Sequence, residues 1–549
     1  MKKIVIIAAL VCGAWQQVDA QYVSKVWVSD QKDGTYINPI IHADYSDPDV
    51  CAVGDDFYMT ASSFGCTPGL PILHSKDLVN WRLANYALKE IEPTIFFNAP
   101  QHGKGVWAPS IRYHNGEFFI YWGDPDWGIF MVKTKDPLGE WEKPVLVKAG
   151  KGMIDPTPLW DEDGKVYLVH AWAGSRAAFN SVITVCEMNA GGTKVISEPV
   201  LVFDGNDGVN HTIEGPKFYK RNGYYYILAP AGGVVTGWQL ALRSRNVYGP
   251  YESKIVMAQG DTDINGPHQG GWVETCTGES WFINFQDKAM YGRVLHLNPV
   301  KWENDWPVIG EDKDGDGCGE PVKRYKKPDV GRIYPIETPI ESDEFNTRQL
   351  GLQWEWHANY QDTFGFTSDL GYIRIYGHIL SKDFVNFWEV PNLLLQKFPA
   401  EEFTATAKLK VSAKADGQQS GLIVMGWDYG YLGVVKEGDK FILNQVVCKD
   451  AEQRSPETVT HLAELPVSRR FGAGLYPNYE RDIYLQVKVT GGGICYFSYS
   501  LDGRKYTLAG VPFTARQGKW IGAKVGLFST APYGKERGWV DADWFRIDK

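Results

Sequence analysis

Tyr45-Ser46-Asp47-Pro48-Asp49-Val50 sets an acidic residue against a proline at the start of a predicted strand. Variants of this phrase return about every fifty residues, as Trp107-Ala108-Pro109-Ser110, Asp155-Pro156-Thr157-Pro158, Glu214-Gly215-Pro216-Lys217 and a looser Gly266-Pro267-His268-Gln269. An internal repeat of this period is typical of radial folds such as propellers. Three of the five phrases carry a carboxylate, so the repeat predicts a group of acids around one axis.

Each phrase is followed by a short strand, a two-residue turn and an aromatic-rich second strand. The turns are Gly54-Asp55, Asn115-Gly116, Asp163-Gly164, Asn222-Gly223 and Thr277-Gly278. Such turns are typical of two-residue β-hairpins. The second strands are expected at 56–59, 117–121, 165–169, 224–228 and 280–284. Five such units between residue 37 and about residue 310 predict a five-bladed β-propeller.

The remainder of the chain follows a different pattern. From Ile340 onward, longer strands alternate apolar and polar residues at 403–410, 420–425, 483–489 and 523–528, which predicts a β-sandwich. A length of 549 residues also favours two or more domains. We therefore expect an all-β protein with an N-terminal lead at 21–36, a propeller at 37–325, a linker at 326–340 and a sandwich at 341–549.

Residues 1–20 are predicted to be a signal peptide. Lys2 and Lys3 precede the apolar run from Ile4 to Cys12, and Val18-Asp19-Ala20 provides a small-x-small cleavage site. The run is too short to span a bilayer, and no later stretch approaches the required length. The sequence thus predicts export to the periplasm or medium after cleavage near Ala20, without membrane insertion.

Charge and cysteine content exclude several classes of partner and fold. The net charge is −10 with no basic run, which argues against nucleic acid or an anionic membrane as partner. Aromatic residues make up 14 % of the chain and suit stacking on sugar rings, although most are expected in the core. After cleavage seven cysteines remain, and an odd number at irregular spacing is no disulfide framework. A Cys51–Cys66 pair stays open, with buried small side chains as the favoured interpretation.

One stretch between the two predicted domains has the start of a calcium-binding loop. Asp312-Lys313-Asp314-Gly315-Asp316-Gly317 follows the D-x-D-x-D-G pattern, but position twelve is Lys323 instead of an acid. A solvated acidic turn and a calcium site outside the EF-hand class both remain open.

The repeated motifs carry a resemblance to a known family. The runs Asn38-Pro39-Ile40, Tyr45 to Val50, Gly54 to Tyr58, Ser62-Ser63-Phe64 and His74 to Trp81 resemble glycoside hydrolase family 43. Trp107-Ala108-Pro109, Ile154-Asp155-Pro156, Glu214-Gly215-Pro216, His268 and Gly292-Arg293 match its further motifs in order. The family contains β-xylosidases, α-L-arabinofuranosidases and arabinanases on five-bladed propellers.

This resemblance implies a role for each acid. Asp47 is similar to the general base that activates water, and Glu214 to the general acid that protonates the departing oxygen. Asp155 is similar to the third acid, which raises the pKa of the general acid and orients it. Hydrolysis with inversion needs the acid and base about 6.5–9.5 Å apart, which suits acids from opposed blades. Because Glu214 lies two residues before its proline while the other two acids lie one before theirs, the side chains need not project alike.

The resemblance also implies a sugar pocket and a class of substrate. Phe64, Trp107 and His268 match residues that wall the pocket, and Arg293 matches an arginine that hydrogen-bonds the sugar. Ile154 departs from relatives that have an aromatic residue there, so the pentose stays undecided. No cofactor is required, while a calcium ion on the propeller axis near His268 remains open.

The predicted sandwich resembles the lectin-like domain of family β-xylosidases, in which a loop aromatic closes one side of the pocket. Trp520 occupies the matching place, although an ordinary core position is the alternative. We therefore expect an exo-acting, inverting enzyme that removes terminal β-D-xylose or α-L-arabinofuranose from hemicellulose oligosaccharides, with β-xylosidase placed first. An arabinofuranosidase that debranches xylan, arabinan or xyloglucan, an endo-acting arabinanase and a non-catalytic carbohydrate-binding propeller are the alternatives. The oligomeric state is not defined by the sequence.

Overall fold

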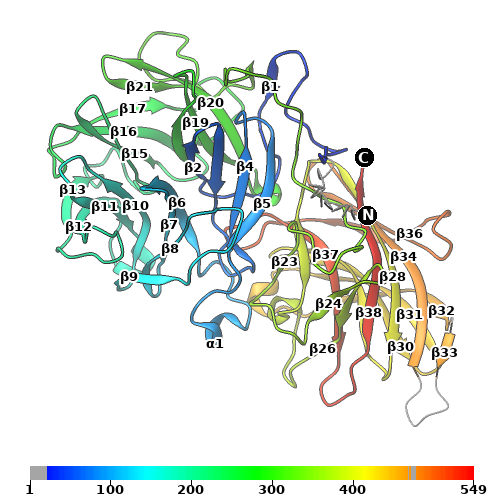
Figure 1. Ribbon diagram of the computed structural model, residues 1–549. Helices are drawn as coiled ribbons and strands as arrows, with labels where there is room; N and C mark the ends of the chain where they lie inside the picture. The colour runs from blue at the N-terminus through cyan, green and yellow to red at the C-terminus, as the bar shows by residue number, and fades with distance from the viewer. Residues whose placement is uncertain (1–20, 468, 472–477) are drawn as a thin grey trace, which may run out of the picture.

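The computed structural model describes residues 21–467, 469–471 and 478–549, and it places them in two all-β bodies side by side (Figure 1). The first, drawn from blue to green, is a propeller, and the second, drawn from yellow to red, is a sandwich. Both predicted architectures are confirmed. The predicted signal peptide lies outside the described residues. Within the described ranges, no helix is long and apolar enough to cross a membrane.

The propeller has five blades, each a four-stranded antiparallel sheet in chain order. Blade one has β2 (Asp49–Val53), β3 (Asp56–Thr60), β4 (Gly69–Ser75) and β5 (Trp81–Leu88). Blade two has β6 (Trp107–His114), β7 (Glu117–Asp124), β8 (Gly128–Thr134) and β9 (Val145–Ala149). Blade three has β10 (Met153–Trp160), β11 (Val166–Trp172), β12 (Val182–Met188) and β13 (Val200–Asp204). Blade four has β14 (Lys217–Arg221), β15 (Tyr224–Ala231), β16 (Trp238–Ser244) and β17 (Glu252–Met257). Blade five has β18 (His268–Glu274), β19 (Ser280–Asp287), β20 (Arg293–Glu303) and β21 (Trp306–Ile309).

The hairpin turns form where the sequence predicts them. Asn115-Gly116 has φ values of 49° and 82°, and Asn222-Gly223 has 51° and 72°. Positive φ at both central residues is the condition for a type I′ turn, which Asn-Gly meets at little steric cost. These turns join the first and second strands of blades two and four, so local sequence fixes their register.

The start of each innermost strand has a common backbone feature. One residue per blade has a left-handed φ: Asp47 (55°), Ala108 (32°), Asp155 (56°), Gly215 (61°) and Gln269 (37°). In blades two, three and five these residues lie at breaks in strand register. A bulge of this kind redirects a side chain. In blade four the position is a glycine, so the acid is carried by the preceding residue, which explains the offset of Glu214 from the other two acids.

The chain on either side of the propeller joins its edges. β1 (Thr35–Ile37) pairs with β22 (Arg324–Lys326), which brings the N-terminal lead beside the segment that leaves blade five. The Asn38 side chain donates to the carbonyls of Leu297 and Val322, at 2.8 Å each, and accepts from the Leu297 amide at 2.9 Å. The buried amide of Asn38 thus ties the lead to blade five.

The sandwich consists of two sheets, antiparallel except for the parallel pair β26–β37, packed around the largest apolar core of the described chain. One sheet has the order β23 (Glu355–Trp356), β27 (Leu394–Lys397), β37 (Lys524–Ala531), β29 (Gln419–Met425), β30 (Tyr429–Glu437), β31 (Lys440–Cys448) and β32 (Thr458–Pro466), with β26 (His378–Ile379) beside β37. The other has the order β24 (Gly365–Ser368), β25 (Tyr372–Tyr376), β38 (Trp539–Asp548), β28 (Phe403–Ala413), β34 (Asn478–Thr490), β35 (Ile494–Ser500) and β36 (Thr507–Thr514), with β33 (Arg469–Phe471) beside β34. Short helical turns are α1 (Thr94–Phe97), α2 (Gly174–Ala177), η1 (Ala289–Tyr291), η2 (Phe387–Glu389) and η3 (Ala451–Gln453).

Backbone contacts hold the sandwich against blade one. The amide of Trp356 donates to the Thr67 carbonyl at 2.7 Å. The Asn359 side chain donates to the Ile91 carbonyl at 2.9 Å and accepts from the Ile91 amide at 2.8 Å. Cys51 and Cys66, like the other five cysteines of the described chain, are free thiols. The interface therefore depends on hydrogen bonds, packing and charge without a disulfide.

Candidate active site

Asp47 lies at the centre of a dense set of hydrogen-bond donors at the mouth of blade one. Its Oδ2 accepts from the hydroxyls of Ser46, at 2.6 Å, and Ser62, at 2.7 Å. Its Oδ1 accepts from Arg293 Nη1 at 3.1 Å, and all four residues are buried. Hydrogen bonds to an ionised carboxylate are short and directional. These donors fix the orientation of the Asp47 carboxylate and leave it little freedom to rotate.

Asp155 is the most deeply buried of the three acids, with 3 % of its surface exposed. Its Oδ2 accepts a 2.7 Å hydrogen bond from the amide of Gly215, so it holds the backbone beside Glu214 directly. Burial, followed by the charges of Glu214 and Asp47, raises the pKa of Asp155 well above its usual range. The mutual influence of the three carboxyl groups places them in one electrostatic cluster, as the repeat predicts.

Glu214 is the acid that remains open to solvent, with its side chain 37 % exposed. Its Oε1 lies 3.3 Å from Nε2 of His268, which is fully buried at the start of β18. The Glu214 amide donates to the Pro230 carbonyl on β15 at 3.1 Å. Two acids therefore sit deep at the axis while the third faces outward, an arrangement that gives them unequal access to water and ligand.

Three aromatic side chains line the cluster in succession. The ring of Phe64 lies 6.3 Å from that of Trp107, and the ring of Trp107 lies 6.4 Å from that of Trp520, both in edge-to-face geometry. The Arg293 guanidinium lies 5.7 Å from the Trp520 ring. Trp520 belongs to the sandwich, yet it is 44 % exposed at the propeller mouth instead of packed in the sandwich core. The eight predicted site residues are thus brought together in one place.

Family models match the two bodies separately. Glycosyl hydrolases family 43 matches residues 36–307, and the beta xylosidase C-terminal concanavalin A-like domain matches residues 342–548. The chain belongs to glycosyl hydrolase family 43. It is therefore a glycosidase.

Three relatives cover from 76 % to 94 % of the chain. A protein of Xylanibacter ruminicola is 37 % identical over 514 residues, covering 92 % of this chain and 88 % of that protein. A beta-xylosidase of Formosa agariphila is 33 % identical over 568 residues, with 94 % and 91 % covered. A non-reducing end alpha-L-arabinofuranosidase of Bacteroides ovatus is 31 % identical over 444 residues, with 76 % and 79 % covered. The crystal structure of a family 43 protein from Bacillus licheniformis superposes with a TM-score of 0.78 at 26 % identity and covers 94 % of this chain and 99 % of that one.

Two functional neighbours of the acids were not identified from the sequence. Ser62 donates to Asp47 and accepts from the Ala108 amide at 2.7 Å, so it connects blades one and two at the site. Lys217 is fully buried and donates to the Pro109 carbonyl at 2.8 Å. Burial lowers the pKa of Lys217. A charged residue directly after the proline of a buried strand was the available signal for Lys217.

Asp44 is a third residue that sequence reasoning missed, and it joins the sandwich loop to the propeller. Its Oδ1 accepts from the Arg293 amide at 2.8 Å, and its Oδ2 accepts from the Gly522 amide at 3.0 Å. A Cβ on Gly292 would lie 2.5 Å from the Asp44 carboxyl group, so only glycine fits there. The loop that carries Trp520, which itself has a φ of 64°, is thereby fixed beside Arg293. A tryptophan with a left-handed backbone conformation is an outlier of the kind that clusters at functional sites.

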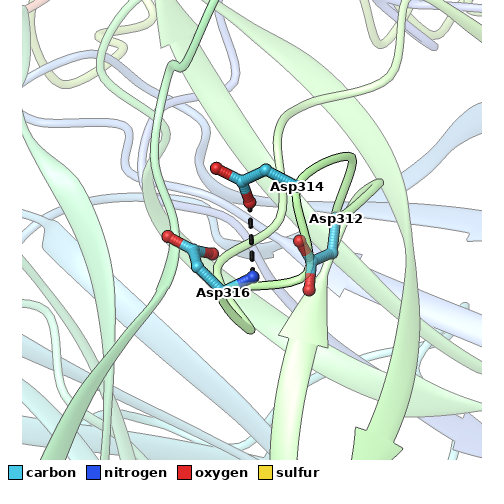
Figure 2. A group of neighbouring side chains, drawn as sticks. All are labelled: Asp312, Asp314 and Asp316. Carbon is cyan, nitrogen blue, oxygen red and sulfur yellow. Dashed lines mark hydrogen bonds between the residues drawn. The ribbon is translucent and has the colours of Figure 1, made fainter.

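The acidic loop between β21 and β22 gathers its three aspartates as the calcium-like pattern suggests (Figure 2). One carboxylate oxygen from each of Asp312, Asp314 and Asp316 lies within 4.8 Å of the others. Asp312 also accepts from the amides of Gly315, at 2.7 Å, and Gly317, at 2.9 Å. The carboxylates are thus already used to stabilise the turn, and both interpretations of the loop remain predictions.

Proposed function

We propose that the protein is an exo-acting, inverting glycosidase that removes a terminal pentose from hemicellulose oligosaccharides, with β-D-xylose placed before α-L-arabinofuranose. The observation that carries the proposal is the position of Trp520. This sandwich residue stands over Arg293 and beside Trp107 at the mouth of the propeller. A wall at this point makes a pocket of the site, and a pocket accepts the end of a chain where an open groove would accept its middle.

The geometry supports complementary tasks for the acids. Asp47, held by Ser46, Ser62 and Arg293, takes a proton from the attacking water as that water bonds to the anomeric carbon. Glu214 gives its proton to the glycosidic oxygen as the bond to that carbon breaks. Water attacks from the face opposite the leaving group, so the product has inverted configuration.

Asp155 and His268 act on Glu214 and not on the sugar bond. Asp155 accepts from the amide of Gly215 and fixes the backbone next to the acid. His268 lies within 3.3 Å of the carboxyl group from the other side. Two buried partners thus define where the proton of Glu214 is delivered, which supports its assignment as the acid.

The choice between the two pentoses rests on the relatives and the C-terminal domain. Relatives with each printed activity are similar to this chain, and Ile154 is buried in the apolar core shared by blades three and four. Xylose is placed first because the C-terminal domain matches the beta xylosidase type over residues 342–548. A binding propeller without catalysis is disfavoured, because burial and then the charges of Glu214 and Asp47 raise the pKa of Asp155, a cost that sugar binding alone does not require.

We also propose that no metal cofactor is required and that the protein is exported. The base, the acid and a cationic arginine are all protein side chains, so the steps above are complete without a metal. Nδ1 of His268 is buried and without a hydrogen-bond partner among the described residues, so it is available to accept a hydrogen bond from a water of a calcium ion bound on the axis. Such an ion would add positive charge near the axis. Export is supported by the residue pattern of positions 1–20.

The test is hydrolysis of 4-nitrophenyl β-D-xylopyranoside and 4-nitrophenyl α-L-arabinofuranoside by the wild type and by Glu214→Ala. We expect turnover of at least one substrate, and a loss of at least about hundredfold in the variant. The ratio of the two rates ranks the sugars. Binding of pentose oligosaccharides without turnover of either substrate would contradict the proposal and favour a binding module.

A further inference from the structure

The sulfur of Cys66 and the amine of Lys524 meet where blade one contacts the sandwich. Lys524 Nζ donates to Cys66 Sγ at 3.2 Å, although the two residues are 458 positions apart in the chain. Both residues are buried, with 6 % of Cys66 and 4 % of Lys524 exposed. Cys66 lies in the segment that joins β3 to β4, and Lys524 is the first residue of β37. A nucleophilic sulfur and an amine are thus held against each other across the two domains.

Lys524 brings a positive charge to the sulfur of Cys66. Glu355 accepts from both Lys397 and Lys524, so two buried cations share one carboxylate. Asp44 is a further buried acid that these lysines influence, but its two oxygens already accept from backbone amides. Burial lowers the pKa of Lys524, whereas Cys66 and Glu355 raise it by more, and the net shift is upward. A cysteine beside a retained cation has the environment in which thiols react with oxidants.

Two other buried cysteines have backbone carbonyls as their partners. Cys448 Sγ donates to the Ser455 carbonyl and Cys495 Sγ to the Gly493 carbonyl, each at 3.4 Å. A carbonyl offers no amine that can be joined to sulfur. These two cysteines therefore serve as comparisons for Cys66 within the same protein.

A cavity of about 60 Å³ gives small molecules a path to the charged cluster. Its lining includes Glu355 and Lys397 of the sandwich and Tyr45 and Tyr86 of the propeller. It extends to Ile340, which is 50 % exposed. The volume is enough for a few molecules of the size of water, and dioxygen is of similar size. Dioxygen dissolved in the medium therefore has access to the immediate surroundings of Lys524.

We propose that Cys66 and Lys524 are an oxidative cross-link site, at which dioxygen joins Sγ to Nζ through one bridging oxygen atom. The O–O bond breaks, and one S–O bond and one O–N bond form. Of the three hydrogens that the sulfur and the amine carry between them, two leave with the second oxygen atom as water and one stays on nitrogen. Sulfur and nitrogen each give up two electrons, and dioxygen takes all four.

The link changes both the charge and the freedom of the interface. It removes the cationic amine of Lys524, so Glu355 and Lys397 remain as a matched ion pair. It also ties the segment of blade one that carries Ser62 and Phe64 to the sandwich by a covalent bond. The inference does not depend on the proposed function, and a wild type without activity on either pentoside would leave it standing.

The test is a tryptic peptide map of the wild type after exposure to oxygenated buffer. Trypsin cuts after lysine and arginine, so a cross-link at Lys524 predicts a product in which residues 33–76 are joined to residues 520–535. Its mass should equal that of the two peptides plus one oxygen atom minus two hydrogen atoms, and dithiothreitol should separate them. Cys448 and Cys495 should stay unlinked. Absence of the joined product, or oxygen carried by Cys66 alone as a sulfenic or sulfinic acid, would overturn the proposal.

Variants and stability provide a second measurement. Lys524→Arg keeps a cation beside Glu355 without a free amine, and Cys66→Ser removes the sulfur, so neither should give the joined product. Lys397→Arg is the matched control, because Lys397 contacts the other oxygen of Glu355, and the link should persist in this variant.

The Tm of the wild type should fall by about 5 °C on reduction, because a cross-link restricts the unfolded chain most when it closes a long loop. The Tm of Cys66→Ser and of Lys524→Arg should not respond to the reductant, and an equal response in either variant would overturn the assignment. Since the peptide map of the wild type is decisive by itself, a poorly folded variant would not end the test.

Discussion

Asp47 and Asp155 occupy equivalent positions in blades one and three, each directly before a proline and each with a left-handed backbone, at φ 55° and 56°. The residue before a proline normally adopts extended geometry, so this conformation is sparsely populated for a non-glycine residue. Blade four has Gly215 at the same position, with φ 61° and no strain of this kind. Ala108 and Gln269 have a left-handed backbone at the same place in blades two and five without a carboxylate. The conformation therefore belongs to the start of every blade, and function enters through the residue that each blade places there.

Replacing Asp155 by asparagine should make the protein more stable at neutral pH and less active. Burial and the neighbouring carboxylates raise the pKa of Asp155. A group whose pKa rises on folding contributes stability below its unfolded pKa, about 3.9, and that contribution is lost as the pH rises through the folded pKa. Asparagine still accepts from the Gly215 amide but has no charge. We expect a higher Tm than wild type at pH 7, a smaller difference near pH 4 and at least about hundredfold lower kcat.

Asp161 in the same blade is a matched control with the opposite sign. Burial raises the pKa of Asp161, whereas hydrogen bonds from Lys220 and Tyr225 lower it, and the net shift is downward. Asp161→Asn should therefore reduce the Tm at pH 7, and this reduction should shrink as the pH falls toward the range in which Asp161 protonates. A Tm for Asp155→Asn below that of wild type at pH 7 would count against the charged cluster described above.

Asp44→Asn should weaken catalysis through the loop that carries Trp520. The asparagine has one acceptor oxygen for two amides, those of Arg293 and Gly522, so one hydrogen bond is lost. We expect kcat/KM for the preferred nitrophenyl pentoside to fall about tenfold, in line with one buried amide left unsatisfied. Asp44 is a positioning residue, because its carboxylate acts through the two amides.

A double-mutant cycle separates this role from general destabilisation. If Asp44 acts partly through Trp520, the loss in the double variant Asp44→Asn, Trp520→Ala should be smaller than the product of the two single losses. Independent losses that multiply in full, together with a lower Tm, would show that Asp44 stabilises the interface and does not position the tryptophan.

The propeller and its acids were predictable because their signals are local. Asn115-Gly116 defines a turn within two residues, and each acid lies one or two residues before its own proline. The position of Trp520 depended on resemblance alone, because nothing in its neighbourhood distinguishes a loop residue from a core one. The contact of Asp44 with Gly522 joins residues 478 positions apart, and no periodicity reports such a pair.

For Arg293, the residue type was enough to predict a place in the site, but its hydrogen-bond partners within the protein were not predicted. A buried arginine needs an acceptor, and the resemblance to family 43 implied a bound sugar in that role. In the structure its Nη1 donates to Ser46 at 2.7 Å and to Asp47 at 3.1 Å. The guanidinium thus helps to orient the proposed base, Asp47. The two residues meet because the propeller closes with blade five beside blade one.

Removal of divalent metal should leave the activity intact. The proposed acid and base are side chains, and the Asp312 loop already satisfies its carboxylates with the amides of Gly315 and Gly317. We expect kcat and KM after treatment with a chelator and dialysis to agree with untreated enzyme within about twofold, a span that corresponds to under 1 kcal/mol. Loss of activity on chelation, restored by calcium, would show that a calcium ion, in the Asp312 loop or near His268, is required.

Glu355→Gln should destabilise the protein strongly, because it leaves two buried cations without their counter-ion. Glu355 accepts from Lys397 and Lys524, and all three belong to the sandwich strands that face blade one. Burial raises the pKa of Glu355, but the two lysines lower it by more, so that the pKa falls to about 2. A group with a depressed pKa contributes stability above its unfolded pKa, near 4.3, and loses it as the pH falls through the folded value.

The expected loss for Glu355→Gln is about 3–5 kcal/mol at pH 7, since breaking a buried ion pair from one side leaves uncompensated charge. The measurement is the Tm and the urea midpoint at pH 7 and pH 3, and the difference from wild type should narrow at the lower pH. Glu344→Gln is the matched control, because Glu344 pairs with Arg546 at the surface, where an ion pair is worth at most about 1 kcal/mol.

Lys524 also lies 3.2 Å from Cys66 of blade one, so we expect Glu355→Gln to loosen the sandwich from the propeller and to lower activity along with stability. Equal effects of the two variants would show that the buried charges are relieved in some other way, for example by loss of a proton from Lys524.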